Sequence, residues 1–236
     1  MNADTKICGA VLSGLYIVIG LSIFGCRQNI LAKQTGFMLR EGDLLFQDLD
    51  CGSLCDAIEK VTTGFQGAKF SHVGIAVKDD ADDFAVIEAL PQGVAVTPLQ
   101  NFLNRSFDKK GQPKVVVGRL KPSLRHLIPL ALKEALALKA KPYDKTFVIG
   151  NKSYYCSELI YEMFLKANEN NPVFTLHPMT FKNPDTGEIF SVWQEYFAQL
   201  GMAVPQGRPG INPGGISRSS ALTIIHVYGI PDGWEG

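Results

Sequence analysis

Three residues whose types together support nucleophilic catalysis occur in short, well-defined segments of this chain. His72 lies in FSHVGIAV, Glu88 in FAVIEAL and Cys156 in YYCSELIYEMF. An imidazole held by a carboxylate can take the proton of a thiol, and the resulting thiolate is a strong nucleophile. This chemistry requires elements that bring the three side chains together.

The pairing of the first two segments decides whether His72 meets Glu88. A loop closed between Lys78 and Asp82 predicts an antiparallel register with three opposed pairs: Ala76 with Phe84, Gly74 with Val86, and His72 with Glu88. Opposed residues share a face, so the carboxylate can orient the imidazole and support a positive charge on it. Gly74 leaves room beside them. A slip of one residue would separate the two side chains.

Cys156 stands where a polar, aromatic lead-in gives way to helical periodicity, which predicts a helix from about Cys156 to Ala167. At a helix N-terminus the unpaired N–H groups and the dipole favour a thiolate, and a nearby imidazolium favours it further. The backbone N–H of Cys156 would then point toward a developing oxyanion. The alternative is structural, because a cysteine that begins a buried helix and a single histidine in a strand are commonly core residues.

Other motifs give little support for different chemistry. Structural or surface roles are expected for His126, His177 and His226. The chain has no GxSxG, P-loop or HExxH motif, which argues against serine hydrolases of the α/β type, nucleotide hydrolases and zinc proteases. Because the formal net charge is zero, we expect no nucleic-acid binding. No metal site and no cofactor are expected.

The order of the remaining segments predicts an α+β domain. Strands are expected at about 41–50, 69–78, 84–90, 93–99, 114–120 and 221–230. Helices are expected at about 53–63, 122–140, 156–167 and 187–201. Runs of strands followed by runs of helices indicate an antiparallel sheet packed against helices, not alternating βαβ units. The stretch 204–215, rich in Gly and Pro, is expected to be a loop.

The N-terminal segment predicts export and membrane attachment. An uncharged apolar run from Ile7 to Gly25 ends directly before Cys26. A small residue before a cysteine is typical of the bacterial lipobox, in which that cysteine is lipidated and becomes the mature N-terminus. The expected division is a signal peptide with its lipobox (1–26), a linker (27–40) and the folded domain (41–236). An uncleaved anchor and a buried core helix are the alternatives.

Two further cysteines, Cys51 and Cys55, lie four residues apart at the start of a predicted helix, in DCGSLCD. They could face each other as a disulfide, but we favour two buried, unpaired side chains because disulfides within helices are uncommon. No histidine or further cysteine lies near them at metal-ligand spacing, so no zinc site is predicted.

Several segments from Glu41 onward resemble the YiiX/YaeF-like permuted papain-like amidases, relatives of the NlpC-type cell-wall peptidases and of lecithin-retinol acyltransferase. These segments are EGDLLFQ, FSHVGIAV, VIEA, PYDKTF, YYCSELIYEMF and GINPGGISRSS. The pair SHVGI and YxCSEL, in this order and spacing, carries most of the specificity. The resemblance implies a circularly permuted papain-like fold, in which the histidine precedes the cysteine.

The same resemblance implies roles for particular residues: Cys156 as nucleophile, His72 as base, Glu88 as orienting residue, and Tyr143, Asp144 and Tyr155 near the substrate. The implied enzyme hydrolyses an amide through an acyl-enzyme and needs no cofactor. For an exported lipoprotein we expect the substrate to be the peptide stem of the cell wall. Lipid-directed acyl transfer or thioester hydrolysis is one alternative, and a non-catalytic lipoprotein that binds envelope components is another.

Overall fold

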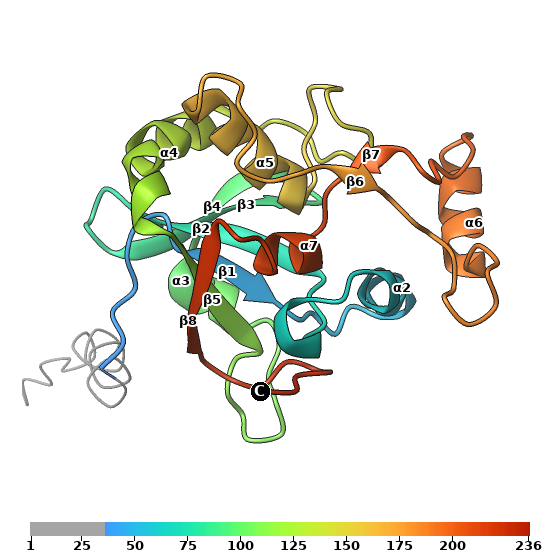
Figure 1. Cartoon of the computed structure of the whole chain (residues 1–236), viewed down its shortest axis with the longest axis horizontal. Coiled ribbons are helices and arrows are strands. Elements are labelled where there is room, and N and C mark those ends of the chain that lie inside the picture. The colour runs from blue at the N-terminus through green and yellow to red at the C-terminus, as the bar shows by residue number, and fades with distance from the viewer. Residues whose placement is uncertain (1–35) are drawn as a thin grey trace, which may run out of the picture. The chain divides into compact units, whose positions relative to one another are not determined.

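A six-stranded antiparallel sheet is the centre of the computed structural model, which describes residues 36–236 (Figure 1). The strands in spatial order are β4 (Gly93–Pro98), β3 (Phe84–Leu90), β2 (His72–Lys78), β1 (Leu44–Gln47), β5 (Val115–Leu120) and β8 (Leu222–Val227). The predicted signal segment with Cys26 lies outside the described residues. Among the described residues, no helix is both long enough and apolar enough to cross a bilayer.

Helices cover the sheet and extend beyond it. The α-helices are α2 (Ser53–Val61), α3 (Leu99–Leu103), α4 (Ile128–Ala137), α5 (Cys156–Ala167), α6 (Ser191–Gln199) and α7 (Pro213–Ser217). Two short 3₁₀ helices, η1 (Phe65–Gly67) and η2 (Pro122–Leu127), and a small pair of strands, β6 (His177–Pro178) and β7 (Pro209–Gly210), complete the order. Figure 1 shows α6 at the end of the excursion that β6 and β7 bound, away from the sheet.

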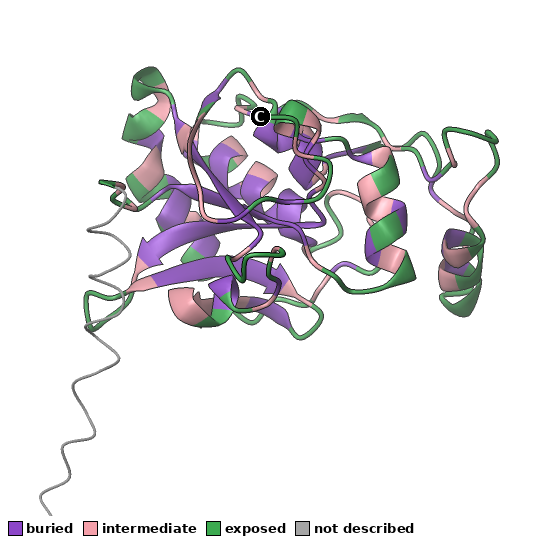
Figure 2. Ribbon diagram, turned by 90° about the horizontal axis from the view of Figure 1, so that it is seen from below, coloured by how far each residue is buried: buried purple, intermediate pink, exposed green. Residues whose placement is uncertain are grey.

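Each face of the sheet packs a separate hydrophobic core, because successive strand residues point to opposite faces. Val73 and Ile75 of β2 pack in the core that α4 and α5 close. Ala76 of β2 packs in the other core, against Phe102 of α3. The four inner strands, β3, β2, β1 and β5, are consequently buried along most of their length (Figure 2).

The predicted α+β organisation is confirmed, and most elements lie where the sequence placed them. Helix α5 spans Cys156–Ala167 as expected. The predicted helix at 122–140 instead begins as η2 and continues as α4, with Pro129 in the first turn of α4. Proline has no N–H to continue the hydrogen-bond ladder, which explains the break. Helices α3 and α7 were not predicted, and α7 begins inside the stretch expected to be a loop.

The β2–β3 register differs from the prediction by two residues. Ala76 pairs with Val86 instead of Phe84. The turn is longer than expected because the side chain of Asp79 accepts hydrogen bonds from the backbone N–H groups of Ala81 and Asp83.

A shift of two residues keeps every side chain on its predicted face. His72 and Glu88 therefore still share a face, but as diagonal neighbours instead of an opposed pair. Gly74 makes room for Val86, whose side chain would overlap any Cβ placed there.

Cys51 and Cys55 form a disulfide, with their Cα atoms 5.5 Å apart, so the favoured prediction of two buried thiols is wrong. Cys51 is exposed and lies before α2, whereas Cys55 is buried within it. Gly52, at φ 83°, turns the chain between Cys51 and the helix. The bridge therefore joins the helix to its entry segment, which avoids the geometry that makes disulfides within helices uncommon.

Candidate active site

His72 joins a carboxylate to the cysteine. It is the first residue of β2 and is 6% exposed, and its Nε2 lies 2.6 Å from Oε2 of Glu88. This bond leaves the other ring nitrogen, Nδ1, available to interact with the thiol of Cys156. Burial lowers the pKa of His72, but hydrogen bonds with Cys156 and Glu88 outweigh it and raise the pKa to about 9. The imidazolium is therefore the main form of His72 at neutral pH.

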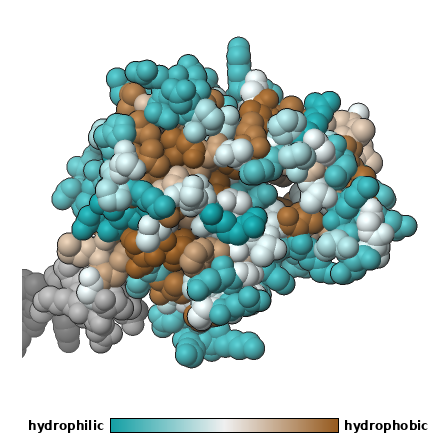
Figure 3. Space-filling view, in the orientation of Figure 1, coloured by the Kyte–Doolittle hydropathy of each residue, from teal (hydrophilic) through white to brown (hydrophobic). Residues whose placement is uncertain are grey.

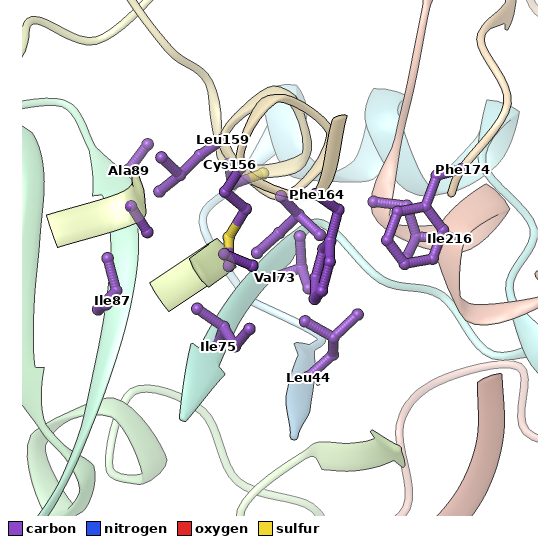
Figure 4. Close-up of a cluster of buried hydrophobic side chains, with 14 of the residues drawn as sticks. Leu44, Val73, Ile75, Ile87, Ala89, Cys156, Leu159, Phe164, Phe174 and Ile216 are labelled. Atoms are coloured by element: carbon purple, nitrogen blue, oxygen red, sulfur yellow. The ribbon is translucent and has the colours of Figure 1, made fainter. Parts of the chain in front are cut away.

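Cys156 is the first residue of α5, as the periodicity predicted. Tyr155 before it has extended backbone, so the N–H of Cys156 lies in the first turn, where helical N–H groups have no partner within the helix. The thiol is free, its residue is 7% exposed, and it lines a cleft. Figure 4 shows Cys156 where α5 meets the sheet, near Val73 of β2.

Glu88 is fully buried and also binds an arginine that the sequence did not single out. The guanidinium of Arg105 donates to both carboxylate oxygens, at 2.6 Å to Oε2 and 2.5 Å to Oε1. Burial raises the pKa of Glu88, but hydrogen bonds from His72, Arg105 and Thr97 outweigh it and lower the pKa to about 2. Glu88 is thus a carboxylate at every pH at which the protein is expected to work.

Arg105 lies in the segment NRSF after α3, and no motif marks it. Its guanidinium lies over the ring of Phe102, 5.2 Å from the ring centre, and the His72 ring lies 5.9 Å from the same ring. The fold of α3 back onto β3 and β4 brings Arg105 to Glu88. Only the tertiary structure could identify it.

The three predicted substrate residues have different positions. Tyr143 and Tyr155 line the cleft with Cys156, and burial raises the pKa of both phenols, so both keep their protons. Asp144 is buried and does not line the cleft. Its carboxylate instead accepts hydrogen bonds from the backbone N–H groups of Thr146 and Val148, which shapes the segment before α5.

The cleft beside Cys156 has a volume of about 120 Å³. Helix α2 forms one wall, the segment 177–181 and α6 form another, and the segment 211–213 closes the side near Tyr155. Apolar and aromatic side chains dominate these walls: Ile58, Val61, Phe147, Phe181 and Trp193. In the space-filling view a hollow lies between the surface formed by α6 and the rest of the domain (Figure 3).

Comparison with known proteins identifies the family. Residues 38–226 match the model of the permuted papain-like amidase family, YaeF/YiiX, C92. The chain belongs to this family. It is therefore a papain-like cysteine amidase, a hydrolase of amide bonds, and its sheet and helices form the permuted papain-like fold.

A solved structure has the same fold. The crystal structure of metalloprotein yiiX from Escherichia coli O157:H7 aligns with a TM-score of 0.67 and 23% identity, and the alignment covers 82% of this chain and 99% of that one. No curated protein matches the chain.

The word metalloprotein describes that relative, and one carboxylate cluster here can be tested for the same property. Asp48, Asp50 and Asp232 lie close enough together to bind a cation. The ammonium of Lys114 lies among them, 2.7 Å from Asp50, 3.2 Å from Asp48 and 3.8 Å from Asp232. Since a positive charge already occupies the cluster, these residues do not fit a divalent ion.

Proposed function

We propose that Cys156, His72 and Glu88 form the catalytic triad of this amidase. The observation that carries the proposal is His72 itself, a buried imidazole that is hydrogen-bonded to Glu88 and whose pKa Cys156 and Glu88 both raise. Its pKa of about 9 and the carboxylate of Glu88 favour an imidazolium, and that charge stabilises a thiolate on Cys156.

The proposed reaction has two steps. The Cys156 thiolate attacks the amide carbonyl carbon, a C–S bond forms, and the oxyanion faces the N–H of Cys156 in the first turn of α5. His72 gives its proton to the leaving nitrogen, the C–N bond breaks, and an acyl-enzyme remains. Water then gives a proton to His72 as it attacks the thioester, the C–S bond breaks, and the carboxylic acid leaves with the imidazolium–thiolate pair restored.

For the substrate we propose an amide bond in a cell-wall peptide. The support is the predicted signal peptide, which would direct export of the chain and lipidation of Cys26. The lipid would tether the chain to a membrane and place the domain in the cell envelope. Such an environment is rich in peptide amides.

A second substrate class, lipid-derived acyl amides or esters, is favoured by the cleft itself. The walls near Cys156 are mostly apolar and aromatic, including Phe147, Phe181 and Trp193. An apolar acyl chain would bury its surface there, and the same thiolate would accept the acyl group.

The first test is the pH dependence of Cys156 alkylation by iodoacetamide. The wild type should react with a midpoint well below 8.5, the usual pKa of a thiol, and His72→Ala should raise that midpoint. His126→Ala, which changes an exposed histidine outside the cleft, is the matched control. An unreactive thiol, or a midpoint that His72→Ala leaves unchanged, would contradict the triad and favour a non-catalytic binding protein.

Substrate class is then decided by comparing cell-wall peptides with acyl amides and acyl esters. Release of a new amine from the peptides by the wild type, and none by Cys156→Ala, is the expected result. Cleavage confined to the acyl compounds would instead support the second class.

A further inference from the structure

A second cavity, of about 440 Å³, lies beside the catalytic cleft. The two share three residues, His177, Ile211 and Asn212. The rest of the second cavity is formed largely by the end of the segment GINPGGISRSS, which the triad does not use. The two cavities therefore meet at a shared wall that contains these three residues.

The shared wall is fixed to the residues on both sides of the nucleophile. The N–H of Ile211 donates to the hydroxyl of Tyr155 at 3.2 Å, and the hydroxyl of Ser157 donates to the carbonyl of Ile211 at 3.0 Å. These bonds set the position of the second cavity relative to Cys156. Helix α7, which follows the wall, also packs against α5.

Hydrogen-bond donors and one cation line the second cavity. Arg218 lies at its rim and forms no ion pair with any residue that the structure describes. The side-chain oxygen of Asn212 accepts from the N–H of Gly215 at 2.7 Å, so its NH₂ group is left to donate. Ser219 and Ser220 add hydroxyls, and no aspartate or glutamate lies in the lining.

We propose that the second cavity is a subsite in which Arg218 binds a carboxylate of the substrate. The proposal rests on the proposed function, because it assigns one end of the substrate that Cys156 cleaves. A guanidinium presents paired N–H groups that match the two oxygens of a carboxylate. With Arg218 as its one arginine or lysine, the subsite matches one negative charge rather than the two of a phosphate monoester. Peptides that carry a free carboxylate are the substrates this subsite selects.

The test measures binding in the full-length Cys156→Ala protein, which cannot turn over. The probes are N-acetyl-alanine peptides of about two to five residues, each made with a C-terminal carboxylate and with a C-terminal carboxamide. We expect the carboxylate member of at least one length to bind about 3- to 10-fold more tightly, as one partly exposed charge-assisted pair provides. Adding Arg218→Gln should remove that difference, whereas adding Arg208→Gln should retain it, since exposed Arg208 lines neither cavity.

Three results would overturn the assignment. They are equal or undetectable binding of the acid and amide peptides at every length, a carboxylate preference that persists in Arg218→Gln, and tighter binding of a phosphate-ended probe than of the carboxylate. Because this assay needs no nucleophile, a failed subsite is distinguished from a failed triad, which the iodoacetamide reaction of Cys156 reports separately.

Discussion

At the scale of single residues, Glu88 is shared between two cations. His72 and Arg105 both donate to its carboxylate, and Arg105 occupies both oxygens. Arg105 thus fixes the plane of the Glu88 carboxylate and keeps it ionised. The negative charge of that carboxylate in turn stabilises the imidazolium form of His72. Arg105 is a positioning residue, since it does not line the cleft beside Cys156.

Replacing Arg105 should move the acid limb of the pH profile to higher pH. Arg105→Met removes one of the groups that hold the pKa of Glu88 near 2, so burial would raise that pKa and Glu88 would protonate nearer to neutrality. A protonated Glu88 no longer supports the imidazolium of His72. The rate of Cys156 alkylation, measured from about pH 4 to pH 8, should therefore fall off at a pH at least about one unit higher than in the wild type.

Arg119→Met is the matched control for this prediction. Arg119 also forms a bidentate pair, with Asp43 at 2.7 Å. Asp43 directly precedes the first residue of β1, whereas His72 pairs with the last residue of that strand, so the control lies at the other end of β1. If both variants lower the rate uniformly without moving the acid limb, Arg105 stabilises the fold and does not position Glu88.

At the scale of elements, α5 holds a buried acidic side chain, Glu158, as its third residue. Glu158 accepts hydrogen bonds from the N–H of Gly150 at 3.1 Å and from that of Tyr155 at 3.4 Å. It thereby connects the segment before α5 to the helix that carries Cys156. Burial outweighs these bonds and raises the pKa of Glu158 from 4.5 to about 8.

This raised pKa predicts a pH-dependent stability. Between about pH 4.5 and pH 8 the folded state keeps a proton on Glu158 that the unfolded state has lost, so the free energy of unfolding falls as the pH rises across that window. Glu158→Gln mimics the protonated acid and should flatten the fall, by on the order of 2 kcal/mol at its upper end. Urea unfolding of both proteins at several pH values checks this. Parallel pH curves for the two proteins would show that Glu158 is not the titrating group.

At the scale of the whole molecule, the cleft exists because segments far apart in the sequence pack closely. Helix α7 approaches the end of α2 so tightly that a Cβ on Gly214 would overlap the carbonyl oxygen of Thr62. A Cβ on Gly210 would likewise overlap the side chain of Met179. The glycines of GINPGG therefore allow the segment after β7 to form a wall of the cleft.

Gly214→Ala should separate α7 from α2 and lower the free energy of unfolding by about 1–3 kcal/mol, because the added methyl group meets backbone that cannot move cheaply. Gly215→Ala is the neighbouring control, since its Cβ would lie 3.3 Å from the flexible side chain of Asn212. Denaturant unfolding of both variants under non-reducing conditions gives the comparison. Equal losses in the two would mean that the α2–α7 contact is not limiting.

The sequence by itself determined most of the strands and longer helices, and the faces on which their residues lie. The two-residue period of β2 and β3 placed His72 and Glu88 on one face even though the register was wrong by two, because an even shift keeps the face. The helical period and the polar lead-in located Cys156 at the start of α5, and the strands before the helices indicated the α+β class.

Only the tertiary structure decided which distant residues meet. The turn at Asp79 set the register through its side chain, and Gly52 allowed the Cys51–Cys55 bridge, effects that strand and helix periodicity do not encode. Arg105 and the wall containing Ile211 reach the site through packing between segments far apart in the chain. Sequence periodicity reports local geometry, whereas such contacts depend on how complete elements pack against each other.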